Sequence, residues 1–313
     1  MKQILIRKHS LGLNENQVLA NLPAEALWLA NFVSHATKQS YKTSVRQFYD
    51  YFGMQTLEDL RTASSSHVIA WRDAMIEAGM KARSINGKVS ALSSLFDSLC
   101  EQQVVAINPT RGLKRPKVQQ SRVETPVITK DQVRKLLDAP GTKTAKGLRD
   151  TAMLYTFFYS GCRRTEVCRL RVSDLLFDNG YFVMDFTIKG GKRNRIAVHQ
   201  ELQMILRRYL AEADHAGEPE APLFMALYQS KRRQALTPRS INQMFRSYAR
   251  KVGLPDNVTP HSARATFITQ ALENNCPIEA VQASVCHADI STTQMYDKRE
   301  KTYRDSASFA VRF

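Results

Sequence analysis

The stretch TPHSARATFIT, from Thr259 to Thr269, predicts the start of a helix that carries two side chains suited to phosphate. Thr259 is a good helix cap, and Pro260 suits the first helical position. His261 and Arg264 stand three residues apart and therefore share one face of this helix. A helix amino terminus favours anions, so the pair adds a proton acceptor and a bidentate clamp for oxygen. Alone, a His and an Arg at this spacing are more often ordinary surface neighbours.

Two further segments, one on each side of this stretch, supply the context. The segment at 159–170 reads YSGCRRTEVCRL and contains Gly161, Arg163 and Glu166. The segment at 285–299 reads VCHADISTTQMYDKR and places Tyr296 nine residues after His287. In order, spacing and residue type, the three segments resemble the tyrosine recombinase (phage integrase) family. The motifs of that family read roughly G-x-R-x-x-E, H-x-x-R and G-H-x-x-x-x-T-x-x-x-Y.

The resemblance implies catalytic roles for six side chains and a supporting role for one carboxylate. The catalytic residues are Arg163, Lys189, His261, Arg264, His287 and the nucleophile Tyr296, and the supporting residue is Glu166. In the implied reaction the tyrosine attacks a DNA phosphate and forms a 3′-phosphotyrosyl bond, and the freed 5′ hydroxyl later restores the phosphodiester. Arginines clamp the phosphate, the lysine protonates the leaving oxygen, and His261 acts as the base. No metal, ATP or other cofactor is implied, and the sequence contains no CxxC pair or HExxH motif.

Four positions leave alternatives open. For Glu166 the alternative to a supporting carboxylate is an ordinary acid on a helix surface. Arg164 competes with Arg163, although the glycine and the glutamate of the motif fix its register on Arg163. Lys192 competes with Lys189, because KGGKRNR places its final arginine one residue later than the family's usual K-G-x-K-x-R. Cys286 replaces the glycine that usually precedes the second histidine. A side chain there would alter the local turn, because glycine reaches backbone angles that cysteine does not reach readily.

The wider sequence predicts two domains, mainly α with a small β-hairpin (α+β). A chain of 313 residues exceeds what one core usually supports, about 250 to 300 residues. Four helical patterns fit between Leu22 and Gln103, with stops at Gly53 and Gly79 and a start at Ser64–Ser66. The predicted division is an extension at 1–21, a helical core-type DNA-binding domain at 22–108, a basic linker at 109–128, and a catalytic domain with a tail at 129–313.

The second half opens with a capping-box pattern from Thr129 to Gln132. Its one clear β signal runs from Tyr181 to Ile188, continues through the turn KGGKRN and ends with Arg195 to Val198, which together predict a hairpin that carries Lys189. Helical patterns resume at Glu201 and return over 240–252, 261–274 and 277–285. The resemblance implies that the first domain is SAM-like and that the two domains form a C-shaped clamp on DNA.

The charge of the chain indicates a polyanionic partner. Lys and Arg exceed Asp and Glu by 16, with +6 in residues 1–128 and +10 in residues 129–313, so both halves are basic. The strap NPTRGLKRPKVQQSR at 108–122 has five basic residues and no acid. Such a protein gains affinity for a duplex by releasing counterions, and the alternative is a merely solubilising surface. Candidate DNA contacts are Arg83, Lys88, Arg111, Lys114, Arg115, Lys117, Arg239 and Arg246.

The expected partner is double-stranded DNA with specific recombination sites, bound by a homotetramer that can include a partner recombinase. The resemblance implies that a carboxyl-terminal segment docks on a neighbour, and Phe309, Val311 and Phe313 would be that segment unless the tail folds back on its own domain. No apolar run approaches the roughly 20 residues of a membrane span, so a cytoplasmic, nucleoid-associated protein is expected. The alternatives are a type IB topoisomerase, a telomere resolvase, and a catalytically silent architectural DNA-binding protein.

Overall fold

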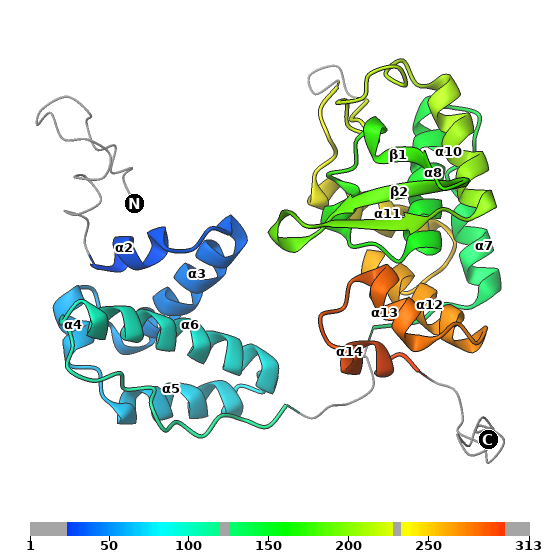
Figure 1. Ribbon diagram of the computed structural model, residues 1–313. Coiled ribbons are helices and arrows are strands. Elements are labelled where there is room, and N and C mark those ends of the chain that lie inside the picture. The colour runs from blue at the N-terminus through cyan, green and yellow to red at the C-terminus, as the bar shows by residue number, and fades with distance from the viewer. Residues whose placement is uncertain (1–23, 119–124, 228–232, 298–313) are drawn as a thin grey trace, which may run out of the picture. The chain divides into compact units, whose positions relative to one another are not determined.

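The computed structural model describes residues 24–118, 125–227 and 233–297 (Figure 1). The chain divides into two compact units, residues 1–120 and 121–313, and each is described by itself. The predicted extension at 1–21 and the tail residues Phe309, Val311 and Phe313 lie outside the described residues. No helix in the described ranges combines the length and the apolar character that crossing a bilayer would require.

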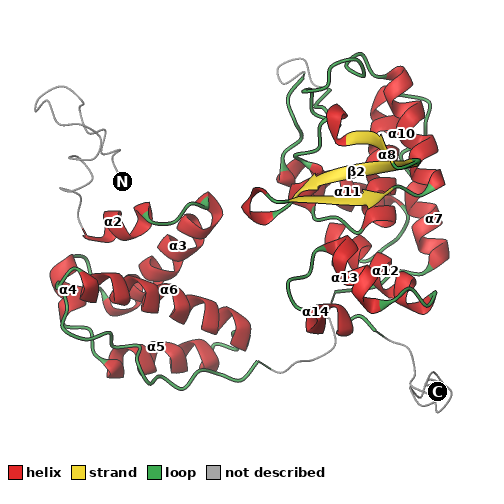
Figure 2. Cartoon of the chain, viewed as in Figure 1, coloured by secondary structure: helices red, strands yellow, loops and turns green. Residues whose placement is uncertain are grey.

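In the described part of the first unit, every regular element is a helix, and loops join the helices (Figure 2). Its helices are α2 (Ala24–Ala30), α3 (His35–Phe52), α4 (Leu57–Arg61), α5 (Ser65–Glu77) and α6 (Ala82–Glu101). Gly53 ends α3 in the left-handed conformation, and Ser64 is the N-cap of α5, as their sequence signals predicted. The predicted number of four helices is wrong, because α4 has only five residues and is too short to show a helical period.

Aromatic side chains at helical spacing form the core of the first unit. Phe48, Trp71 and Phe96 are almost completely buried, and the rings of Phe48 and Trp71 meet edge to face with centroids 5.2 Å apart. The indole nitrogen of Trp28 donates to Ser94 Oγ at 3.1 Å, so its one polar atom has a partner. These residues therefore serve packing, in agreement with their periodicity.

The described part of the strap, residues 108–118, lies against α5 and α6 of the first unit. The Asn108 amide donates to Asp97 Oδ1 at 2.7 Å and to the Ser93 carbonyl at 3.1 Å. Further along, Arg72 Nη1 donates to the Lys114 carbonyl at 2.9 Å, and Asn86 Nδ2 donates to the Pro116 carbonyl at 3.0 Å. The backbone of the strap is thus fixed by side chains of α5 and α6.

The second unit combines a small antiparallel sheet with helices, and the sheet lies in front of α8 and α11 in Figure 2. Its elements are α7 (Lys130–Asp138), α8 (Ala145–Ser160), α9 (Arg164–Val167), η1 (Val172–Asp174), β1 (Leu175–Asp178), β2 (Tyr181–Thr187), η2 (Lys189–Gly191), β3 (Arg193–Ala197), α10 (Gln200–Glu212), α11 (Pro238–Lys251), α12 (Pro260–Glu273), α13 (Ile278–Val285) and α14 (Ile290–Gln294). The strand order is β1-β2-β3. The predicted hairpin is confirmed as β2 and β3, and β1 is an additional strand.

Helix α8 runs through the centre of the second unit. It contacts α7, α10 and α12, and most of its side chains are buried, including Phe157 and Phe158, whose rings both meet Phe245 of α11. The buried polar side chains of α8 have partners in the core: Arg149 donates to Asp150 Oδ1 at 2.6 Å and to the Met225 carbonyl at 2.7 Å. Because such partners offset the cost of burying polar groups, α8 can occupy the core. A separate small cluster joins Ile268 of α12 to Val281 of α13 and borders the site described next.

Candidate active site of the second unit

Arg163 is held by Glu166 at the junction of α8 and α9. Arg163 is the N-cap residue of α9, and Glu166 is the third residue of that helix. One carboxylate oxygen of Glu166 accepts from the Arg163 backbone N–H at 2.5 Å, and the other accepts from Arg163 Nη1 at 2.8 Å. Glu166 is 6% exposed, whereas the Arg163 side chain is 37% exposed. A buried carboxylate therefore orients a guanidinium that still reaches solvent.

Arg264 projects from α12 and is 4% exposed. Its Nη1 donates to the Gly161 carbonyl at 2.7 Å, and its Nη2 donates to the Val285 carbonyl at 2.5 Å. Burial and the nearby positive charge of Arg163 lower the pKa of Arg264 to about 10. The guanidinium is thus still charged at neutral pH, and backbone carbonyls fix its position.

Gly161 allows α8 and α12 to approach each other at this point. It ends α8 with φ 61°, in the left-handed region that favours glycine. A Cβ atom on Gly161 would lie 2.4 Å from Cδ1 of Phe267, which belongs to α12. In the sequence, Gly161 served only to fix the register of the motif. Its close approach to Phe267 and its hydrogen bond from Arg264 both involve α12, more than 100 residues away.

His261 lies on the first turn of α12, where the sequence placed it. Thr259 is the N-cap and Pro260 the first helical residue, as predicted. Residues of α11 and α12 and the α8–α9 junction surround a small pocket of about 180 Å³, to which His261, Arg163, Arg164 and Asn242 contribute. Partial burial and then the charges of Arg264, Arg164 and Arg163 lower the pKa of His261. Its imidazole is therefore neutral at neutral pH and able to accept a proton.

His287 and Tyr296 lie together beyond the end of α13. Their rings stack with centroids 6.2 Å apart and planes 20° from parallel. Burial, followed by the charges of Arg264 and Arg163, lowers the pKa of His287 to about 4, and burial raises the pKa of Tyr296. The Tyr296 carbonyl accepts from the Thr269 hydroxyl of α12 at 3.4 Å.

Thr293 is the partner of His287, a contact that the motif did not identify. Thr293 Oγ1 lies 2.9 Å from His287 Nδ1, and its side chain is completely buried. In the family pattern the threonine falls at Thr292, one residue earlier. When the threonine hydroxyl donates to Nδ1, the neutral imidazole carries its proton on Nε2.

Cys286 forms the left-handed turn that the family's glycine would form. Its φ is 49° and its ψ 56°, at the C-cap of α13, and its thiol donates to the Ala283 carbonyl at 3.5 Å. The cysteine therefore adopts a left-handed backbone conformation that glycine reaches more readily. Its carbonyl accepts from Arg163 Nη2 at 3.2 Å.

The hairpin of β2, η2 and β3, called the lysine hairpin because Lys189 lies in its turn, contacts its surroundings through side chains that were not among the predicted site residues. Lys189 lies in the turn η2 between β2 and β3, and the Lys192 side chain is exposed beside it. Asp185 of β2 accepts from Arg195 Nε at 2.8 Å and Nη2 at 2.9 Å. The Asn194 amide donates to the Ser284 carbonyl of α13 at 2.9 Å. Arg195 opposite Asp185 was visible as an antiparallel pair of opposite charges, whereas the Asn194 contact had no sequence signal.

The candidate DNA contacts are distributed over both units. Arg83 and Lys88 lie on α6, four more lie on the strap at 111–117, and Arg239 and Arg246 lie on α11. Lys88 contacts Gln47, and Arg246 Nη2 donates to the Asp256 carbonyl at 2.9 Å. On the first unit, Arg115 Nη1 of the strap donates to Ser90 Oγ of α6 at 2.7 Å, so the strap lies against the helix that carries Arg83 and Lys88.

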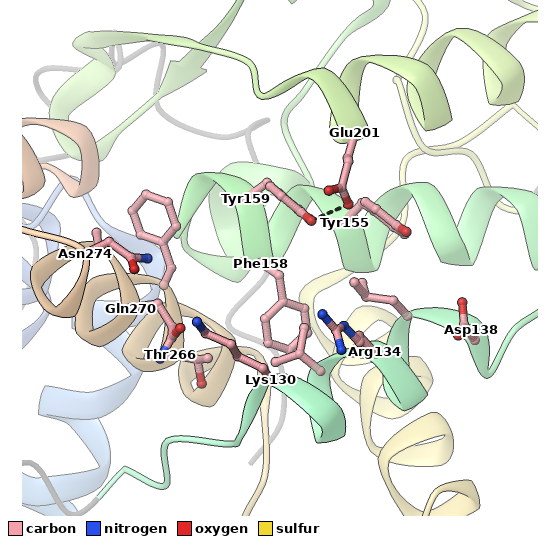
Figure 3. Close-up of a pocket in the computed structure, with 14 residues that line it drawn as sticks. Lys130, Arg134, Asp138, Tyr155, Phe158, Tyr159, Glu201, Thr266, Gln270 and Asn274 are labelled. Carbon is pink, nitrogen blue, oxygen red and sulfur yellow. Dashed lines mark hydrogen bonds between the residues drawn. The ribbon is translucent and has the colours of Figure 1, made fainter. Parts of the chain in front are cut away.

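A larger pocket of about 490 Å³ lies among α7, α8, α10 and α12, apart from these residues (Figure 3). Lys130 and Arg134 contribute cations to it, and Phe158 contributes apolar surface. Tyr159 donates to Glu201 at 2.5 Å across one wall. None of the predicted catalytic side chains lines this pocket. No group of three His, Cys, Asp or Glu side chains in the described parts of the chain is arranged to hold a metal ion.

The model of the phage integrase family matches residues 126–302, more than half of the chain and the whole span from Arg163 to Tyr296. The chain belongs to the phage integrase family. The model of the phage integrase N-terminal SAM-like domain matches residues 24–103. The resemblance and the mainly helical fold class inferred from the sequence are thereby confirmed.

Curated relatives of this integrase-family chain carry the name tyrosine recombinase. XerD of Listeria monocytogenes serotype 4b (strain F2365) is 30% identical over 266 residues, which cover 84% of this chain and 88% of XerD. XerA of Pyrococcus horikoshii is 27% identical over 275 residues, which cover 86% of this chain and 88% of XerA. Both relatives extend the similarity over both units.

Solved structures of family members share the fold. The XerH site-specific recombinase bound to its difH substrate matches with a TM-score of 0.67 and 18% identity, over 87% of this chain and 78% of that chain. A lambda integrase dimer bound to a COC′ core site matches with a TM-score of 0.65 and 18% identity, over 89% of this chain and 94% of that chain.

Proposed function

We propose that this integrase-family chain is a site-specific DNA recombinase that cleaves and rejoins DNA through Tyr296. One observation carries the proposal: Arg163 and Arg264 both donate to carbonyls of the turn at 285–286, directly before His287, whose ring stacks on Tyr296. Two fixed guanidiniums, a histidine and a tyrosine are what phosphoryl transfer to a hydroxyl nucleophile requires. The curated relatives are named as recombinases, which favours this function over a topoisomerase, a telomere resolvase or a silent architectural protein.

In the proposed reaction Tyr296 Oη attacks the scissile phosphorus and the bond to the 5′ oxygen breaks. Arg163 and Arg264 bind the non-bridging oxygens, where negative charge grows in the transition state. His287 Nε2, protonated while Thr293 donates to Nδ1, donates a further hydrogen bond. The covalent 3′-phosphotyrosyl bond keeps the energy of the phosphodiester, so a 5′ hydroxyl can reverse the attack without ATP.

Proton transfers complete the proposed reaction. The Tyr296 hydroxyl, whose pKa is raised by burial, needs a base, and His261 is neutral because its pKa is lowered. Lys189 would give a proton to the departing 5′ oxygen, with Lys192 as the alternative donor. Because the pKa of His261 is lowered and the pKa of Tyr296 is raised, the first step begins with a neutral histidine and a protonated tyrosine.

The decisive test is covalent capture on DNA that carries the chain's own site. With a nicked duplex that traps the intermediate, the native chain should form a detergent-stable, protease-sensitive adduct, and Tyr296→Phe should form none. Tyr181→Phe is the matched control, because Tyr181 is 66% exposed on β2 and lies outside the site. A Tyr296→Phe chain that still forms the adduct would overturn the proposal.

We further propose that the chain acts on double-stranded DNA as a tetramer inside the cytoplasm, with the basic surfaces of both units on the duplex. A lambda integrase tetramer bound to a Holliday junction has the same fold, with a TM-score of 0.64. In this assembly the tail residues Phe309, Val311 and Phe313 would dock on a neighbouring copy. Removing residues 307–313 should then preserve binding to a single half-site and abolish the tetramer in sedimentation; an unchanged tetramer would contradict tail docking.

A further inference from the structure

Three consecutive carbonyls at the carboxyl end of α13 accept hydrogen bonds from three separate parts of the candidate active site. In order along the chain, the pairs are Ser284 with Asn194 Nδ2 at 2.9 Å, Val285 with Arg264 Nη2 at 2.5 Å, and Cys286 with Arg163 Nη2 at 3.2 Å. The donors come from β3, from α12 and from the α8–α9 junction. One helix end therefore contacts the lysine hairpin and both arginines.

Elementary helix chemistry explains why this end can serve three donors. The last carbonyls of a helix have no partner within the helix, and together they carry partial negative charge. Guanidinium groups are therefore favoured there, and an amide donor satisfies the third carbonyl. The left-handed turn at Cys286 ends α13 immediately before His287, so the histidine leaves the same helix end.

The contact of Asn194 differs from the other side-chain contacts of β3. Arg193 donates to Asp174 of η1, and Arg195 donates to Asp185 and Asp178, so these three bonds stay within the sheet and the turn before it. The Asn194 bond crosses instead to α13 and links the hairpin to the helix that orients the arginines. The Asn194 bond therefore couples the position of the hairpin turn to the position of the two arginines that would bind the phosphate.

We propose that the carboxyl end of α13 aligns two parts of the site: the lysine that protonates the leaving oxygen, and the pair Arg163 and Arg264, called the arginine clamp. Asn194 is the positioning residue for the hairpin that carries the lysine. The inference rests on the proposed recombinase function. Asn194 touches neither substrate nor nucleophile, and its effect on the reaction passes through the hairpin. A displacement of about 1 Å is enough to cost about a hundredfold in rate, so the loss of this one bond has a measurable consequence.

The test replaces Asn194 by Asp, which keeps the shape and removes the donor. In single-turnover cleavage of nicked DNA, Asn194→Asp should slow the reaction about tenfold to a hundredfold. Sulfur in place of the bridging 5′ oxygen should restore its rate, because a thiolate leaves without a proton. Lys189→Ala and Lys192→Ala show which lysine donates, since only the variant that lacks the proton donor is rescued by sulfur. DNA affinity and the melting temperature are measured in parallel.

The outcomes separate this inference from the function on which it rests. If sulfur rescues neither lysine variant, the role of the lysine is wrong and the inference falls with it. If sulfur rescues one lysine variant while Asn194→Asp cleaves the oxygen substrate at the native rate, or stays slow on sulfur, the inference alone is overturned. Rescue of both the lysine variant and Asn194→Asp supports it.

A second pair of variants tests the helix end itself. Cys286→Val should resist the left-handed turn, displace the carbonyls from both arginines and slow cleavage about a hundredfold on the oxygen and the sulfur substrate alike. Cys286→Gly also lacks the thiol but favours the left-handed turn, so this conservative variant should cleave at the native rate. A Cys286→Val chain that cleaves normally, or that sulfur restores, would refute the role of the turn.

Discussion

His287 shows clearly how burial and neighbouring charge lower the pKa of one side chain. Partial burial, followed by the charges of Arg264 and Arg163, opposes its protonation and brings its pKa to about 4. Thr293 Oγ1 lies 2.9 Å from Nδ1 at one edge of the ring, and Tyr296 stacks on its face. The ring is therefore a neutral hydrogen-bonding group in a site whose positive charge comes from arginines.

The depressed pKa of His287 predicts a loss of stability in acid. An unfolded histidine takes up its proton near pH 6.5, whereas the folded one does so near pH 4, so the unfolded state binds more protons in between. Stability is fully present above about pH 6.5 and should fall as the pH drops toward 4. Thermal unfolding across this range should show a shallower decline for His287→Asn than for the native chain.

Thr293→Val tests whether the pH dependence comes from burial and the arginines or from the hydrogen bond between Thr293 and His287. The substitution removes the partner of Nδ1 but leaves the arginines and the burial that lower the pKa. Its melting temperature should therefore keep the native dependence on pH. Equal slopes for the native chain and His287→Asn would show that this histidine does not titrate as described.

At the scale of elements, the junction of α8 and α12 decides whether the arginine clamp forms. Gly161 ends one helix, lies under Phe267 of the other and offers its carbonyl to Arg264. The small cluster between α12 and α13 then fixes the second partner of Arg264, the Val285 carbonyl. Packing between three helices thus fixes the position of Arg264 in the candidate active site.

Gly161→Ala should destabilise the second unit by about 2–4 kcal/mol, because the left-handed conformation and the overlap with Phe267 each add a cost. Gly253→Ala is the matched control: φ at Gly253 is 74°, yet nothing lies within 4 Å of the new Cβ. Urea unfolding should show the larger loss for Gly161→Ala. Equal losses would mean that the contact with Phe267 adds nothing.

The same scale shows why some elements could be predicted and others could not. The hairpin of β2 and β3 was predictable because aromatic and β-branched residues flank a glycine turn, and α12 because a cap and a proline precede its first turn. Strand β1 has four residues and α4 has five, too few for a period to be visible. Short elements of this kind are fixed by their neighbours, since β1 pairs along β2.

At the scale of the whole molecule, the positive charge separates into two kinds of group. Arg163 and Arg264 are held by a carboxylate and by carbonyls in the candidate active site. The basic residues of α6 and the strap, by contrast, are mostly exposed on the first unit. The first kind suits chemistry at one phosphate, and the second suits many weak contacts along a duplex.

This separation predicts a steep dependence of DNA binding on salt, with a loss of about 10³ to 10⁵ in affinity between 50 and 200 mM if six to ten phosphates are contacted. Arg163→Ala should abolish strand cleavage and reduce the salt slope by only about one contact. Lys117→Ala on the strap should reduce the slope similarly and leave cleavage intact at saturating DNA. Affinity measured by fluorescence anisotropy at several salt concentrations checks both, and a salt-independent affinity would contradict them.

The sequence by itself, through its resemblance to the family's motifs, predicted the identity and order of the candidate catalytic residues, because caps, periodicity and motif spacing are properties of short segments. It placed His261 and Arg264 on one helical turn and Tyr296 after His287 without any knowledge of the fold. Only the tertiary structure decided how these groups are held. Arg163 meets the Cys286 carbonyl across 123 residues of chain, and Asn194 meets Ser284 across 90, so the contacts depend on how whole helices pack, which no local pattern encodes.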